Sequence, residues 1–347
     1  MSDQMKPQMQ TSLDFSKLFR LASILVSIGI IMVTGGGSWD ISNHILNKPE
    51  TFFAPPHAVL YSGVGVSLVG FAILFLSWKK QPNPQRYGRG IKIIAIGITS
   101  LLSAGPIDFA WHTRFGLDGL LSPPHLILIF GMFLSSIGAL YVSKSLVAES
   151  QNKARIIVSL IPVWLSTTGL LHSFSLPFSK TDYFDFNPDP VFGAVFASIS
   201  YPFLISTVLL GGSLFAKRQF GIATSIGAAY LGIMTLSAII PNHTLILTIP
   251  FYLVNIIPII LGDIIISKSQ NSKAPWIAGA IFGSTFYFLY YPLITYTYNE
   301  VTLDKLMWPS MTSNIYFEMM PLVGPILILV GAGIGCLAAK FAIKISA

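Results

Sequence analysis

Long apolar segments recur along the whole chain, and they constrain its fold more than any other feature of the sequence. A helix of about 20 apolar residues crosses a bilayer, and backbone groups in lipid must form hydrogen bonds within their own segment. We therefore expect an all-α, polytopic membrane helical bundle of about ten transmembrane helices. The expected segments are residues 21–36, 58–77, 93–107, 126–142, 156–171, 191–215, 221–240, 245–266, 274–296 and 321–342.

Composition agrees with this interpretation. The chain is 53% hydrophobic and 10% charged, whereas a soluble domain has about 25% charged residues. No stretch long enough for a separate soluble domain interrupts the apolar segments. Residues 1–347 are therefore expected to form a single integral membrane domain that contacts the lipid bilayer.

Positive charge is distributed unevenly between the loops. With an even number of spans, one side of the membrane holds both termini and every second loop. That side carries all of the 21 lysines and arginines except Lys48, Arg114, Lys180 and Lys305. Cytoplasmic loops are rich in lysine and arginine, so we predict a cell-membrane protein with both termini cytoplasmic. The net charge of +7 then reflects topology and does not indicate nucleic acid binding, because no basic stripe interleaved with aromatics is present.

A pattern of acids and histidines occurs twice, 68 residues apart, at the predicted outer ends of the first four segments. Each copy has an aspartate, a histidine four residues later, an acid in the following loop, and then Pro-Pro-His. The first copy is Asp40, His44, Glu50 and Pro55-Pro56-His57, and the second is Asp108, His112, Asp118 and Pro123-Pro124-His125.

The spacing of this pattern predicts how its side chains meet. Aspartate and histidine four residues apart lie on one face of a helix, and proline suits the first turn of the returning helix. Residues 21–142 are thus expected to form tandem helical hairpins, followed by further transmembrane helices over residues 156–342. Each hairpin brings one carboxylate and two imidazoles to the same depth, with an acid nearby for orientation or proton transfer.

Ionisable groups at membrane depth are costly and usually functional, so we interpret each set as a three-ligand metal site with an open position. The chain has one cysteine, Cys336, and no thiolate site is expected. Imidazole and carboxylate ligands suit copper, zinc or iron, and the affinity order favours copper. Hydrogen-bonded structural histidines or a proton relay are the alternative interpretation.

These motifs resemble the metal-binding motif of the C subunit of particulate methane and ammonia monooxygenases. The match covers residues 39–125 and is closer in the second copy, where Trp111 directly precedes the first histidine. The resemblance implies copper at Asp108, His112 and His125, and at a second site formed by Asp40, His44 and His57. It also implies oxygen chemistry and partner membrane subunits. Both copies here begin with aspartate, whereas the downstream motif of that family begins with asparagine.

The favoured hypothesis is therefore a copper-binding membrane protein of an oxygen- or redox-linked complex, with its ligands at the outer face. In a catalytic version, Asp118 and Glu50 would handle protons. Two alternatives use the same ligands: capture or delivery of copper or zinc without catalysis, and a zinc-dependent membrane hydrolase. His172 and His243 end later segments on the same side, and each is interpreted as more typical of a structural histidine than of a ligand.

Overall fold

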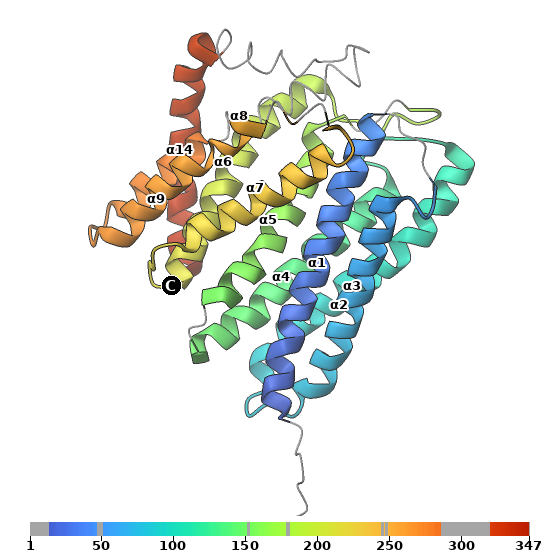
Figure 1. Cartoon of the computed structure of the whole chain (residues 1–347), viewed down its shortest axis with the longest axis horizontal. Helices are drawn as coiled ribbons and strands as arrows, with labels where there is room; N and C mark the ends of the chain where they lie inside the picture. The colour runs from blue at the N-terminus through green and yellow to red at the C-terminus, as the bar shows by residue number, and fades with distance from the viewer. Residues whose placement is uncertain are drawn as a thin grey trace, which may run out of the picture.

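The structure is a computed structural model that describes residues 14–46, 51–150, 153–177, 181–243, 246, 249–285 and 320–346. Its helices, in chain order, are α1 (Phe15–Ile45), α2 (Pro55–Trp78), α3 (Gln85–Phe115), α4 (Pro123–Ser150), α5 (Lys153–Ser175), α6 (Pro190–Phe215), α7 (Ile222–Ile239), α8 (Ile249–Leu253), α9 (Ile256–Lys268), α10 (Ala274–Ser284) and α14 (Met320–Ser346). Helices α1 to α4 lie together on one side of the bundle, and α9 and α14 lie on the other (Figure 1). The described part of the chain contains no strand.

Within the described residues, eight helices are long and apolar enough to cross a membrane: α1 to α7 and the 328–346 part of α14. Large apolar side chains such as Leu76 and Leu329, 74% and 72% exposed, cover the outside of these helices. Such surfaces are stable only against lipid. The prediction of a polytopic helical membrane bundle in contact with the bilayer is confirmed.

Two boundaries differ from the apolar segments in the sequence. Helices α1 and α3 continue past those segments, so Asp40 and Asp108 lie within helical turns. The expected helix over 245–266 is not continuous, because α8 ends at Leu253 and α9 begins at Ile256. In the turn between them, the buried Asn255 side chain donates to Tyr252 O at 2.7 Å, a local bond that competes with the helix. The end of the expected segment 274–296 lies outside the described residues.

The first two helical hairpins pack with the same small residues at the same places. A Cβ atom added at Gly29 in α1 would lie 2.7 Å from Gly63 O in α2, and one added at Gly97 in α3 would lie 2.9 Å from Gly131 O in α4. Glycine at these crossings lets the backbones approach closely. Each pair is separated by the same 68 residues as the polar motifs, so the repeat extends through the membrane helices.

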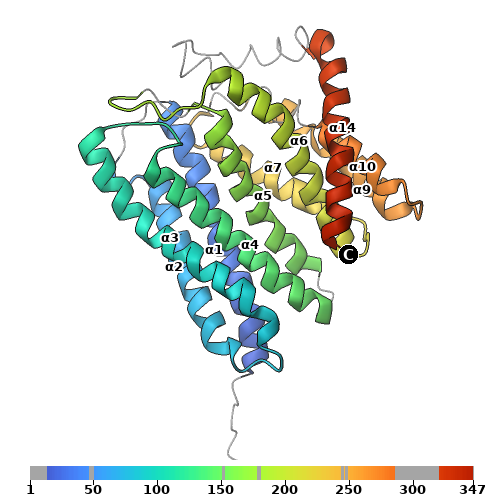
Figure 2. The ribbon, with the colours of Figure 1, turned by 180° about the vertical axis from the view of Figure 1, so that it is seen from behind.

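A buried hydrogen bond joins the second hairpin to α5, and aromatic stacking joins α5 to α7. Ser136 in α4 and Ser166 in α5 share a buried hydrogen bond of 2.7 Å. Behind it, Trp164 in α5 stacks on Tyr230 in α7 with ring centroids 4.1 Å apart and planes 9° apart. Seen from behind, α5 lies between the α3–α4 hairpin and α6 (Figure 2). Helix α5 therefore packs against the second hairpin and connects it to the rest of the bundle.

All the motif residues that the structure describes lie at one end of the bundle. Asp40 and Asp108 belong to the last two turns of α1 and α3, and His57 and His125 belong to the first turn of α2 and α4. The opposite end holds Asp14, which accepts hydrogen bonds from the first turn of α1. That the motif end faces outward, with the termini cytoplasmic, rests on the charge distribution and stays a prediction.

Candidate metal centre

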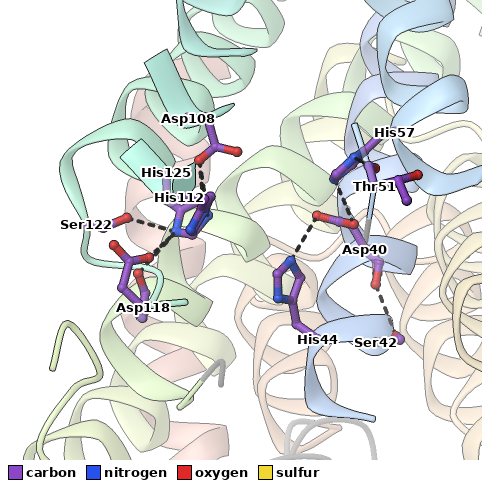
Figure 3. Close-up of polar contacts among 12 residues, drawn as sticks. Asp40, Ser42, His44, Thr51, His57, Asp108, His112, Asp118, Ser122 and His125 are labelled. Atoms are coloured by element: carbon purple, nitrogen blue, oxygen red, sulfur yellow. Dashed lines mark hydrogen bonds and ion pairs between the residues drawn. The ribbon is translucent and has the colours of Figure 1, made fainter. Parts of the chain in front are cut away.

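The α3–α4 hairpin brings one carboxylate oxygen and two imidazole nitrogens together. Asp108 Oδ1 lies 3.3 Å from His112 Nε2 and 3.4 Å from His125 Nε2, and the two Nε2 atoms are 3.3 Å apart. The three side chains point toward one another in Figure 3. Among the described residues, this is the group of three whose ligand atoms all lie within 4.8 Å of one another.

The surroundings of the two rings fix which nitrogen carries the proton. His112 Nδ1 lies 2.7 Å from Gly116 O, and His125 Nδ1 lies 3.1 Å from Gly119 O. A carbonyl oxygen only accepts a hydrogen bond, so each Nδ1 carries a proton. Both Nε2 atoms face Asp108 Oδ1 as ion-pair partners, and each becomes a possible ligand atom when a metal ion replaces its proton. One carboxylate oxygen and two imidazole nitrogens thus lie close enough together to hold a metal ion.

The spacing of these atoms also fits a metal ion. In a tetrahedral site with bonds of about 2.0 to 2.1 Å, neighbouring ligand atoms are about 3.3 to 3.4 Å apart. The observed distances of 3.3, 3.4 and 3.3 Å match that edge. Three protein ligands leave a fourth position, which is the arrangement of sites that admit water or a substrate.

The structure places Asp118 behind His125, on the side away from the other ligands. Its Oδ1 atom lies 3.5 Å from His125 Nδ1, and its Oδ2 atom accepts a 2.6 Å hydrogen bond from Trp111 Nε1. The Asp118 side chain is buried, and Ser122 Oγ lies 2.9 Å from the same imidazole nitrogen. A carboxylate in this position orients a ligating histidine and makes it more basic. The position suits orientation better than proton transfer at the open side.

Sequence reasoning did not find Ser122 or the contacts of the 181–189 loop. Asp182 Oδ2 accepts from Leu117 N at 2.7 Å, and Leu121 N donates to Phe186 O at 3.1 Å. Phe186 also packs on Trp111, with ring centroids 6.2 Å apart. This loop is acidic and aromatic. It covers the α3–α4 turn and holds it in place.

The first hairpin arranges its side chains differently. His57 Nε2 lies 3.1 Å from Asp40 Oδ1, whereas His44 Nε2 lies 3.7 Å from Asp40 Oδ2. The carboxylate sits between the two rings and uses one oxygen for each (Figure 3). Glu50, the acid expected above this set, lies outside the described residues. A metal ion at Asp40, His44 and His57 stays a prediction.

A small cavity lies between the two sets. Its volume is about 60 Å³, and its wall includes Asp40 from the first hairpin, His125 from the second and His172 from α5. Met132 and Met234 line it as well. His172 is buried in this wall, whereas His243 is exposed after α7. Of the two histidines left open by the sequence, His172 is therefore the one that approaches the candidate site.

Comparison with protein-family models, with curated proteins and with solved structures gives no match to this chain. The resemblance to the monooxygenase C subunit therefore rests on the residues of the two motifs. It stays a hypothesis.

Proposed function

We propose that this chain is a membrane metal protein that holds an ion, which we take to be copper, through Asp108 Oδ1, His112 Nε2 and His125 Nε2. One observation carries the proposal: three possible ligand atoms, one carboxylate oxygen and two imidazole nitrogens, lie 3.3 to 3.4 Å apart, while both Nδ1 atoms face backbone carbonyls. These atoms form a partly buried cluster of one carboxylate and two histidines, and ionisable groups at membrane depth are costly and usually functional.

The ligand chemistry and the motif pattern support copper. Imidazole and carboxylate ligands without thiolate suit copper, zinc and iron, and divalent copper binds most tightly of these. The motif pattern resembles that of copper membrane monooxygenases. A copper ion would supply one-electron chemistry and a position for a small ligand, in keeping with an oxygen- or redox-linked role. Other membrane subunits are part of this proposal.

The residues of the chain have distinct roles in this proposal. Asp108 and His112 remain 27% and 21% exposed in their side chains, so a small molecule or a redox partner reaches the open side. Asp118, Trp111 and Ser122 orient His125 from behind. Proton transfer at the open side is left to solvent or to a ligand, because Asp118 lies behind the ring.

The test is metal content measured on the full chain in nanodiscs, by elemental analysis together with copper electron paramagnetic resonance. We expect copper bound to the wild type, with the signal of the second hairpin lost in His112→Ala. His243→Ala is the matched control, because His243 is an exposed histidine at the end of α7. Wild-type protein that binds no metal, or a signal that survives His112→Ala unchanged, contradicts the proposal.

A second candidate is capture or delivery of zinc or copper without catalysis. The tetrahedral spacing and the partial exposure of Asp108 and His112 favour it, since zinc prefers four ligands in this geometry. Zinc in the purified protein, together with rapid transfer of the ion to an added chelator, would support this candidate over the redox role. A zinc-dependent hydrolase would instead keep its ion and cleave a test ester.

A further inference from the structure

A larger cavity lies at the opposite end of the bundle from the metal ligands. The end of α4, the start of α5, and the end of α6 with its following turn form its wall, and Ser346 of α14 also lines it. Its volume is about 360 Å³, within the range of about 300 to about 1,000 Å³ that is typical of ligand sites. Because the α4–α5 connection lies here, the cavity is at the membrane interface, on the side predicted to be cytoplasmic.

The charges of this cavity are of one sign. Lys144, Lys153 and Lys217 come from three different segments and line the same space, and no aspartate or glutamate is among its described lining residues. Ser143 and Gln219 add neutral hydrogen-bonding groups. Three ammonium groups around one cavity repel one another, and an anion bound between them lowers this electrostatic energy.

The side chain of Lys144 and the backbone at Lys217 are held in position by their surroundings. Lys144 Nζ donates to Ile345 O at 2.9 Å and lies 5.0 Å from the centroid of the Phe215 ring. Lys217 and the next residue, Arg218, have φ angles of 53° and 57°, a left-handed conformation that costs about 1 kcal/mol or more per residue. The turn is fixed by a 2.7 Å bond from Arg218 N to Ser213 O. A left-handed turn closed by such a bond is a common end of a helix, and here it fixes the backbone from which the Lys217 side chain projects.

The remaining wall is apolar. Leu140, Ile156 and Phe215 line the cavity next to the lysines. A ligand with a negatively charged head and a hydrocarbon tail would complement both the lysines and the apolar residues of the cavity. Basic pockets between transmembrane helices near the cytoplasmic surface bind the headgroups of anionic lipids.

We propose that this cavity binds the phosphate headgroup of an anionic phospholipid. Lys144, Lys153 and Lys217 would surround the phosphate, and the first carbons of the acyl chains would contact Leu140 and Ile156. The site is independent of the metal centre. Bound lipid would join α4, α5, α6 and α14 at this end of the bundle, because its headgroup contacts residues from each side of the cavity.

The experiment measures lipid binding to the full chain by native mass spectrometry, with phosphatidylglycerol and phosphatidylcholine as probes. The cavity variant is Lys144→Gln/Lys153→Gln/Lys217→Gln. The control variant, Lys80→Gln/Lys92→Gln/Lys273→Gln, removes the same charge from exposed lysines outside the cavity. We expect one tightly held phosphatidylglycerol on the wild type and the control. We expect its affinity to fall roughly 100-fold in the cavity variant, because each of the three lysines near an anionic lipid contributes about 1 kcal/mol.

The same three positions changed to arginine keep the charge and should keep the lipid, which separates loss of charge from loss of folding. Three results would overturn the proposal. The first is equal binding of the two lipids by the wild type, and the second is equal loss in the control and cavity variants. The third is complete displacement of the lipid by millimolar inorganic phosphate, which would identify a site for free phosphate instead.

Discussion

The two N-terminal hairpins share a pattern but differ in how their ligands meet. In both, the histidine after Pro-Pro has its Nδ1 atom beside a backbone carbonyl in the preceding turn: Thr51 O at 3.0 Å for His57, and Gly119 O at 3.1 Å for His125. These pairs are again 68 residues apart. The repeat thus preserves the bond that orients the ring, in addition to the ligands themselves.

The carboxylates differ. A single oxygen of Asp108 faces both histidines of its hairpin, whereas the two oxygens of Asp40 each face a different histidine. The turn above Asp108 is held by Trp111, whose place in the first hairpin is taken by Asn43. The same motif thus provides the same ligand set in both hairpins but does not by itself fix how the carboxylate meets the two histidines.

The largest expected effect is that of removing the charge of the central carboxylate. Asp108→Asn keeps the shape of the side chain but loses the anionic ligand. We expect metal affinity at the second hairpin to fall by more than 100-fold, since even residues behind a ligand account for about 10- to 100-fold. Copper electron paramagnetic resonance on nanodiscs is the measurement.

Asp40→Asn is the comparison variant, and it should leave the spectrum of the second hairpin in place. If both variants remove the same signal, the two hairpins share a single ion, and the division into two sites fails.

The second prediction concerns packing, where the hairpins should behave alike. Gly97→Ala and Gly29→Ala each place a methyl group against the backbone of the facing helix. Overpacking of this kind costs about 1 to 3 kcal/mol of unfolding free energy. We expect a lower thermal midpoint by circular dichroism for both variants, by similar amounts.

Gly65→Ala is the control, because a Cβ atom at Gly65 has nothing within 4 Å. A lower thermal midpoint for Gly97→Ala but not for Gly29→Ala would show that the close helix contact stabilises only the second hairpin.

Third in size is the support behind His125. Asp118→Asn removes the carboxylate charge next to His125 Nδ1 but keeps an acceptor for Trp111. We expect metal affinity to fall by about 10- to 100-fold while the ion remains bound in excess metal. Competition with a chelator measures the change.

Asp185→Asn in the nearby 181–189 loop is the matched control, since Asp185 is exposed and makes a local bond to Asn187 N. If Asp118→Asn folds normally and its metal affinity is unchanged, the buried Asp118 carboxylate does not contribute to metal binding through His125.

Much of the fold and of the ligand set could be predicted from the sequence. Apolar segments define membrane helices because lipid admits few other structures. Spacing of four residues places Asp108 and His112 on one helical face, and Pro-Pro marks the start of the helix that carries His125. These are local rules that need no knowledge of distant contacts.

Other features depend on distant contacts and could not be predicted in this way. The shared use of Asp108 Oδ1 depends on side-chain rotamers and on the crossing of α3 with α4. The cover of the 181–189 loop depends on Asp182 and Phe186, some 65 residues from the turn that they bind. The turn between α8 and α9 depends on the buried Asn255, in a segment whose hydropathy suggests a continuous helix.

The smallest expected effect tests whether the difference between the hairpins can be transferred. Ser122 Oγ lies 2.9 Å from His125 Nδ1, and Ala54 stands at the corresponding place of the first hairpin. Because a hydrogen bond contributes about 1 kcal/mol, Ser122→Ala should weaken metal binding at the second hairpin about fivefold. Ala54→Ser should improve the first hairpin by a similar factor, measured by chelator competition for each variant. If Ala54→Ser has no effect on metal affinity while Ser122→Ala weakens it, the hydroxyl strengthens metal binding only in a hairpin whose ligands already converge. The difference between the hairpins then lies in the convergence of the ligands and not in this hydrogen bond.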